Sequence, residues 1–259
     1  MDVRRNAVSV FDDCVVKTGD PELMRLEAIK TIEAEKIAQK TNLFRVPHIL
    51  DFNQTQGIIK YEFIDGLQAL RGIVSENSYQ SAMNQVGKSL AAVHQSLTLP
   101  QEFAVPLPPE YDFINDRKEV FLHGDFGIGN MFLNKNDNSL VILDWQATRK
   151  IGSRATYGTR YFDLAWFIYN MFYRPSSRQR YKMNVPAEQM SRVFLESYFE
   201  ASNCHCDYNE FISYMNRFLT IKSEARKKGF HFKRRILLIR SHWKLGRFLK
   251  SLKSVQTFC

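Results

Sequence analysis

The sequence has few cysteines and lacks any long apolar run. Only Cys204 and Cys206 lie close together among its four cysteines, and no second Cys/His pair of that spacing completes a zinc site. No apolar stretch of the kind found in a secretory signal follows Met1, and the longest apolar candidate, 164–172, includes an asparagine. We therefore expect reduced thiols and a cytoplasmic protein.

Acidic residues are almost absent from the C-terminal segment. Between Lys222 and Lys253 there are twelve Lys and Arg residues and one acid, whereas the rest of the chain holds 24 basic and 26 acidic residues. The formal charge of +9 is therefore a property of this segment. Basic residues alternate with aromatic and aliphatic ones over 226–253, which suits a core-packed helix with a solvated outer face or a peripheral helix on the inner membrane surface. We expect no nucleic-acid partner.

The pattern of predicted elements changes in kind near Asp65-Gly66. The N-terminal part is rich in β-strand signals with one helix, which Asp20-Pro21 opens. Its expected elements are a hairpin at 8–17, a helix at 21–40 and strands at 46–52 and 57–64. The expected elements of the second part are a helix at 78–97, short strands at 120–122, 131–133 and 140–143, and helices after 160. This order predicts an α+β chain with an N-terminal lobe over 1–65 and a mostly helical lobe over 66–259.

A cluster of polar residues stands out in the segment 121–145. His123, Asp125 and Asn130 lie on a loop between two short strands, and Asp144 follows the next strand. Hairpin geometry brings Asp144 back beside Asn130, so that two carboxylates and an amide converge. An amide and a carboxylate suit Mg²⁺, which takes few protein ligands, and a carboxylate nearby can accept the proton of an attacking hydroxyl.

The motif His-x-Asp-x-x-x-x-Asn followed by a metal-binding Asp resembles the kinase catalytic loop. The forms His-Gly-Asp and Leu-Asp-Trp are similar to those of the aminoglycoside phosphotransferase and choline kinase-like family. Five further segments resemble motifs of that family in the same order, and together they cover roughly residues 8–170. These segments are Val15-Val16-Lys17, Arg45-Val46-Pro47, the stretch 61–66, Ala91-Ala92-Val93-His94 and the stretch 161–165.

The resemblance implies a bilobed protein kinase-like fold with a reduced N-terminal lobe, and a phosphotransferase that uses ATP and Mg²⁺. By this resemblance Asp125 is the catalytic base, Asn130 and Asp144 hold the metal, and Lys17 contacts the ATP phosphates. His123 and Asp163 are implied to be structural residues of the catalytic loop.

The resemblance also implies an acidic helix residue that pairs with Lys17. Helical phase places Glu33 on the apolar face of its helix and Glu35 nearly opposite, so we choose Glu33. Adenine is expected to bond the main chain of Glu62 and Ile64. No glycine-rich loop precedes Lys17, and only the segment 4–6 could take its place.

The acceptor is expected to be a hydroxyl of a small molecule, such as a sugar, a glycan or a glycolipid. The basic C-terminal segment argues for an anionic acceptor. Two alternatives remain open. One is a protein Ser/Thr kinase, which the absence of an Ala-Pro-Glu segment disfavours, and the other is a non-catalytic pseudokinase that binds a membrane or a nucleic acid.

Overall fold

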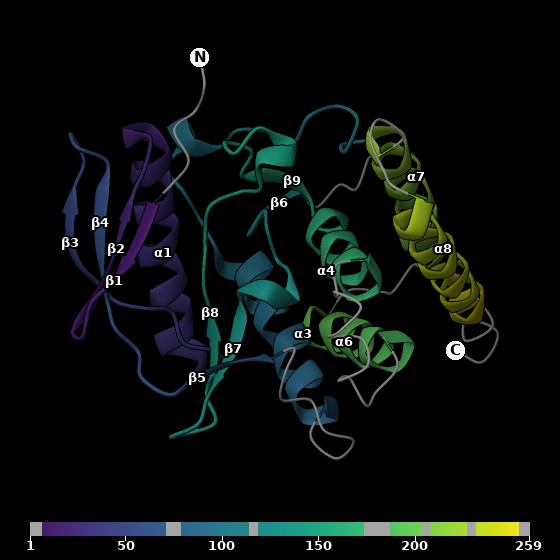
Figure 1. The fold of residues 1–259 in the computed structure, drawn as a ribbon, viewed down its shortest axis with the longest axis horizontal. Coiled ribbons are helices and arrows are strands. Elements are labelled where there is room, and N and C mark those ends of the chain that lie inside the picture. Colours follow the sequence, from purple (N-terminus) through teal and green to yellow (C-terminus); the bar gives the residue numbers. More distant parts are fainter. Residues whose placement is uncertain are drawn as a thin grey trace.

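The computed structural model describes residues 7–70, 79–113, 119–173, 187–203, 208–226 and 232–253 (Figure 1). For 224–226 and 232–238 only the backbone is considered. The segment 4–6, Ser78, Cys204 and Cys206, which entered the sequence analysis, lie outside the described residues.

The N-terminal part is an antiparallel sheet backed by one long helix. The sheet has the strand order β1-β2-β4-β3, and helix α1 lies along it (Figure 1). The element bounds are β1 Ala7–Val10, β2 Cys14–Thr18, α1 Pro21–Thr41, β3 Ile49–Asn53 and β4 Ile58–Glu62. A small apolar cluster joins helix to sheet through Leu23, Met24 and Ala28 of α1 and Ile59 of β4.

Helix α1 has clear end signals. The Asp20 side chain accepts hydrogen bonds from the backbone N–H groups of Glu22 and Leu23, and Pro21 occupies the first turn, where its missing N–H has no cost. Asn42 ends the helix in the left-handed conformation with φ 55°. The helix is therefore placed by local sequence before its tertiary contacts are considered.

The C-terminal part is mostly helical. Its described helices are α3 Tyr79–Ser96, α4 Tyr161–Tyr173, α6 Ala187–Ala201, α7 Tyr208–Arg226 and α8 Phe232–Lys253. Helices α3 and α6 pack closely at Gly87, where a Cβ atom would lie 2.5 Å from the Phe194 carbonyl oxygen. Helix α4 is buried along nearly its whole length, and α7 and α8 lie at the opposite side of the molecule from the β1–β4 sheet (Figure 1).

Two small antiparallel sheets accompany the helices of the C-terminal part. One has the order β5-β7-β8, and the other pairs β6 with β9. Their bounds are β5 Leu67–Ala69, β6 Glu119–Phe121, β7 Met131–Asn134, β8 Leu140–Ile142 and β9 Tyr157–Thr159. The loops that leave β6, enter β7 and leave β8 carry the polar cluster of the sequence analysis.

Most of the predicted elements are confirmed. The hairpin, the long helix and the strands around the polar cluster form as expected. The strand predicted from 46 begins only at Ile49. The backbone of Arg45 pairs with β8 instead: its N–H donates to the Leu140 carbonyl, and its carbonyl accepts from the Ile142 N–H. Pro47 has no N–H to donate, so the strand cannot begin there. Strands β5 and β9 were not predicted.

One hydrophobic core joins α1 to the C-terminal helices. It includes Leu26, Ala34 and Ile37 of α1 together with residues of α3, α4 and α6. The lobe boundary at residue 65 stays a prediction.

Among the described helices, none is both long enough and apolar enough to cross a membrane.

Candidate active site

A cavity of about 670 Å³ is lined by residues of both parts of the chain. From the N-terminal part it takes side chains of β1, β2 and α1 and the segment after β4, and from the C-terminal part the loops after β6 and β8. Six of the seven predicted site residues line it, namely Lys17, Glu62, Ile64, Asp125, Asn130 and Asp144.

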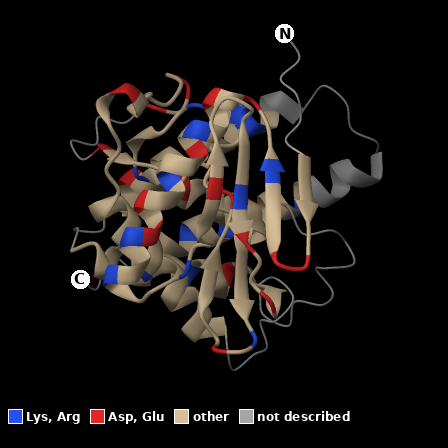
Figure 2. Ribbon diagram, turned by 90° about the vertical axis from the view of Figure 1, so that its left-hand side faces the viewer, with Lys and Arg blue, Asp and Glu red and all other residues tan. Residues whose placement is uncertain are grey.

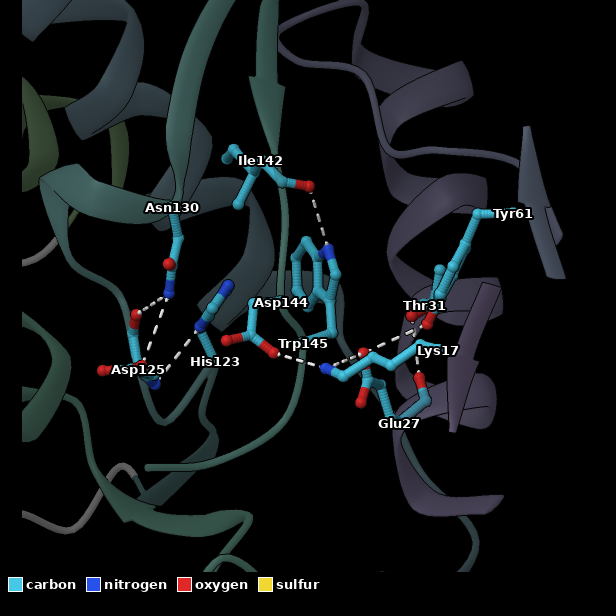
Figure 3. Close-up of polar contacts among 10 residues, drawn as sticks. All are labelled: Lys17, Glu27, Thr31, Tyr61, His123, Asp125, Asn130, Ile142, Asp144 and Trp145. Atoms are coloured by element: carbon cyan, nitrogen blue, oxygen red, sulfur yellow. Dashed lines mark hydrogen bonds and ion pairs between the residues drawn. The ribbon is translucent and has the colours of Figure 1, made fainter. Parts of the chain in front are cut away.

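Lys17 lies between two carboxylates in this cavity (Figure 3). Its Nζ is 2.7 Å from Glu27 Oε1 and 2.7 Å from Asp144 Oδ1. Burial alone would lower the pKa of Lys17, but Glu27 and Asp144 together raise it. Lys17 is therefore a firmly charged ammonium group at the end of a strand, as phosphate binding requires.

The prediction that Glu33 pairs with Lys17 is wrong. Glu27 takes this position, whereas Glu33 bonds Lys36 at 2.7 Å on the surface and Glu35 bonds the His48 ring at 2.9 Å. Burial raises the pKa of Glu27, and Lys17 opposes that shift. Tyr61 donates to Glu27 Oε1 at 3.1 Å, which gives the buried carboxylate a second partner.

Asp144 reaches the cavity because the chain turns sharply there. Its backbone has φ 58°, in the left-handed region that few residues other than Gly, Asn and Asp adopt. Trp145, which follows it, is buried, donates to the Ile142 carbonyl at 3.2 Å and packs on the His123 ring. The tryptophan of Leu-Asp-Trp thus anchors the turn, while the Asp144 side chain stays 42% exposed.

Asp163 of α4 holds the backbone of the loop that carries Asp125. Its carboxylate accepts the N–H groups of His123 at 2.8 Å and Gly124 at 2.9 Å, and a bond from His94 Nε2 at 3.1 Å. Burial alone would raise the pKa of Asp163, but His94 and the loop groups lower it. A buried charge satisfied in this way fixes a loop, as predicted for this residue.

Gly124 permits the loop to pass close to the segment after Asp144. Its φ is 83°, and a Cβ atom there would lie 2.8 Å from the Ala147 Cβ atom. The Gly124 carbonyl also accepts the Thr148 N–H at 3.1 Å. Glycine is required at this position for both conformation and space.

His123 and Asn130 orient the loop around Asp125 (Figure 3). Burial lowers the pKa of His123 to about 4, so its ring is neutral at pH 7 and its Nδ1 accepts the Asp125 N–H at 3.2 Å. Asn130 Nδ2 donates to the Asp125 carbonyl at 3.0 Å. A neutral, buried ring bonded to the backbone fits a structural role for His123.

The Asp125 carboxylate has a partner that the sequence analysis did not identify. The indole N–H of Trp166, one turn after Asp163 on α4, donates to Asp125 Oδ1 at 2.5 Å. Two ammonium groups lie near the same indole ring, Lys222 at 4.7 Å and Lys150 at 5.6 Å from a ring centroid. The sequence signal was the spacing of three from Asp163, which places both side chains on one side of α4.

Asn130 and Asp144 offer suitable ligands for a magnesium ion. The Asn130 nitrogen is bonded to the loop backbone, which leaves its oxygen as the atom for a cation, and Asp144 has a second carboxylate oxygen besides the one on Lys17. An amide and a carboxylate oxygen that line one cavity are a fitting donor set for an ion that keeps water and phosphate ligands. Within the described ranges, no group of three His, Cys, Asp or Glu side chains forms a metal site of its own.

These features define a class of protein. A small sheet with a lysine–glutamate pair, facing a helical part whose loops carry Asp125, Asn130 and Asp144, is the arrangement of a kinase-like phosphotransferase.

Comparison with known proteins agrees with this class. Residues 98–189 match the family model APH, described as the phosphotransferase enzyme family. No curated protein sequence gave a significant match. The family model therefore agrees with the family that the motifs resemble. This match supports the class of small-molecule phosphotransferases.

Solved structures confirm the protein kinase-like fold. The GDP complex of aminoglycoside 2'-phosphotransferase-IIIa is similar with a TM-score of 0.56 at 12% identity, covering 93% of this chain and 90% of that one. Choline kinase LicA from Streptococcus pneumoniae gives 0.51 at 12% identity, with 97% and 91% covered. Macrolide 2'-phosphotransferase MphH from Brachybacterium faecium gives 0.51 at 14% identity, with 85% and 80% covered.

Proposed function

We propose that the chain transfers the γ-phosphoryl group of ATP to a hydroxyl group of a small molecule, with Mg²⁺ as the metal. The observation that carries the proposal is that Lys17, Asp125, Asn130 and Asp144 line one cavity although they come from three separate segments. A purely structural loop would not need a charged lysine, a carboxylate and an amide facing the same space.

Each residue has a definite task in this reaction. The hydroxyl oxygen of the acceptor attacks the γ-phosphorus, and Asp125 accepts the proton that this hydroxyl loses. The bond between the γ-phosphorus and the bridging oxygen of the β-phosphate breaks. Lys17 binds phosphate oxygens, and Asn130 and Asp144 would hold Mg²⁺, which supplies neutralisation of the phosphate charge. Trp166 holds Asp125 Oδ1 so that the carboxylate keeps one orientation.

The nucleotide is proposed to bind below the N-terminal sheet. Val8, Val15 and Phe63 line that part of the cavity with apolar surface for adenine. The Glu62 N–H already bonds the His48 carbonyl at 2.9 Å, so we assign the adenine contacts to the Glu62 carbonyl and the Ile64 backbone. GDP in the structure of aminoglycoside 2'-phosphotransferase-IIIa supports nucleotide binding by this fold.

The acceptor is proposed to be an anionic sugar or glycan. Arg149 and Lys150 line the cavity beyond Asp144, and the Lys150 ammonium lies 5.6 Å from the centroid of the indole ring that holds the base. Cationic groups around the acceptor side favour a substrate that already carries phosphate or carboxylate. Choline and aminoglycosides are cations and fit this side less well.

A transfer screen tests the proposal. Labelled ATP is offered with neutral sugars, phosphorylated sugars, amino alcohols, aminoglycosides and a Ser/Thr-rich protein, each with the wild type and Asp125→Asn. We expect transfer to an anionic sugar-type hydroxyl, reduced roughly 100-fold or more in the variant. Labelling of the protein substrate alone would make the chain a protein kinase. A wild type that neither binds ATP nor labels any acceptor would be a pseudokinase and would end the proposal.

A further inference from the structure

Helix α8 presents an outer face of unusual composition. From residue 239 onward its buried side chains are Ser241, Leu245, Phe248, Leu249 and Leu252. At 100° per residue these residues form one row, and Trp243 lies directly opposite that row. The inner row packs on the neighbouring helices, for example through Phe248 against Phe172 of α4.

The outer face exposes large apolar side chains at its centre. Trp243 is 58% exposed and Ile239, one turn earlier, is 69% exposed. They have the highest exposures among the large hydrophobic side chains of the described helices. Scattered apolar residues are normal on a surface, but a tryptophan and an isoleucine one turn apart make a continuous apolar strip.

Cationic side chains border this strip along one side and follow it further along the helix. Arg240, Lys244, Arg247 and Lys250 are all exposed on the same helix, and the Arg247 guanidinium lies 4.7 Å from the Trp243 ring centroid. The sequence contains no acidic residue after Glu224. The sheet side of the molecule, by contrast, carries acidic and basic residues together (Figure 2).

We propose that the outer face of α8 docks on an anionic lipid bilayer, with Ile239 and Trp243 entering the interface and the four cations at the headgroups. An interfacial helix combines apolar side chains with neighbouring cationic ones, and tryptophan favours the depth where ring and headgroup meet. Since α8 lies at the side of the molecule away from the N-terminal sheet, a planar surface can reach it (Figure 1).

Charge argues against a second copy of this chain as the occupant. Two α8 faces placed together would bring at least eight cations into one interface with no acidic partner on either helix, by the residues named above. An aliphatic side chain at the centre of the face adds nothing to phosphate binding, which disfavours a nucleic acid. The inference does not depend on the proposed transfer reaction.

Vesicle binding of the full chain tests the inference. The protein is mixed at low salt with phosphatidylcholine vesicles, with or without phosphatidylglycerol, and separated by flotation. We expect binding to the anionic vesicles alone and release as salt rises to about 0.5 M. Trp145 and Trp166 are buried, so a blue shift of emission and quenching by brominated lipid chains report on Trp243.

Variants identify the face. Arg240→Glu with Lys244→Glu, and separately Trp243→Gln, should each weaken vesicle binding roughly tenfold or more while ATP binding stays unchanged. Lys40→Glu with Lys135→Glu makes the same charge change at exposed positions elsewhere and should leave most of the binding. The inference is overturned if anionic vesicles do not bind the wild type, if both double variants lose binding equally, or if duplex nucleic acid binds in place of vesicles.

Discussion

The Nζ atom of Lys30 lies 2.7 Å from the backbone carbonyl oxygen of His123 and donates a hydrogen bond to it. Lys30 is fully buried on α1, and Glu27, which holds Lys17, precedes it on the same helix by three residues. One helix thus fixes both Lys17 and the loop that carries Asp125. A shift of α1 would displace both together.

Lys30 gives a first prediction, on stability against pH. Burial is the main cause that lowers the pKa of Lys30 to about 8, from an ordinary value of 10.5. The negative charges of Asp163, Glu27, Asp144 and Asp125 oppose that shift. From about pH 8 to 10 the unfolded chain keeps a proton that the folded chain has released. The free energy of unfolding therefore increases as the pH rises. Lys30 contributes at most about 1.4 kcal/mol per pH unit to this increase.

The variant Lys30→Met lacks this contribution. Urea unfolding of both proteins at pH 7.5, 8.5 and 9.5 should show the wild type gaining stability relative to the variant as pH rises. Because the free energy of unfolding of the variant is subtracted from that of the wild type at each pH, the contributions of the other titrating groups cancel. A constant difference across this range would show that the folded protein does not lower the pKa of Lys30 to about 8.

The second prediction concerns the partner of Lys17. Glu27→Gln keeps the size of the side chain but removes the charge that holds Lys17, and we expect roughly tenfold weaker ATP binding by calorimetry. Glu33→Gln is the matched control, because Glu33 bonds only the exposed Lys36 in the described residues. Equal effects of the two substitutions would contradict the assignment of Glu27.

The third prediction is that Asp163→Asn destabilises the fold. The carboxylate accepts hydrogen bonds from the His123 N–H, the Gly124 N–H and the His94 ring, whereas an amide has only one accepting oxygen. The free energy of unfolding should therefore fall by about 3 kcal/mol. Thermal unfolding measures it. Asp137→Asn, on an exposed turn, is the control, and a change of under about 0.5 kcal/mol at Asp163 would refute the anchoring role.

The fourth prediction separates positioning from folding. Trp166→Phe retains most of the buried ring but removes the N–H that holds Asp125 Oδ1, so kcat should fall roughly 10- to 100-fold with little change in KM for ATP. Trp243→Phe changes an exposed tryptophan and should leave kcat unchanged. Loss of ATP affinity in Trp166→Phe would indicate a collapsed site instead.

Local signals sufficed for much of the fold. The start of α1 at Asp20-Pro21 and the hairpin of β7 and β8 depend on nearby residues, and both were predicted. Strand β5 was missed because its three residues pair with β7, more than sixty positions later, and nothing local marks them.

The partner of Lys17 was missed for a different reason. Helix α1 is buried on two sides, one toward the sheet with Leu23, Met24 and Ala28, the other toward the main core with Leu26 and Ile37. Glu33 was chosen by its helical phase relative to the second side alone. Glu27 lies on the first, and helical periodicity does not tell which buried side faces Lys17.

Magnesium-dependent ATP binding tests the central claim most directly. Calorimetric titration with ATP, in Mg²⁺ and in EDTA, is made on the wild type, Asp144→Asn and Asp125→Asn. The account predicts that Mg²⁺ strengthens ATP binding in the wild type and in Asp125→Asn, and that Asp144→Asn loses this dependence. An ATP affinity unaffected by Mg²⁺, or one that keeps its full Mg²⁺ dependence in Asp144→Asn, would contradict it.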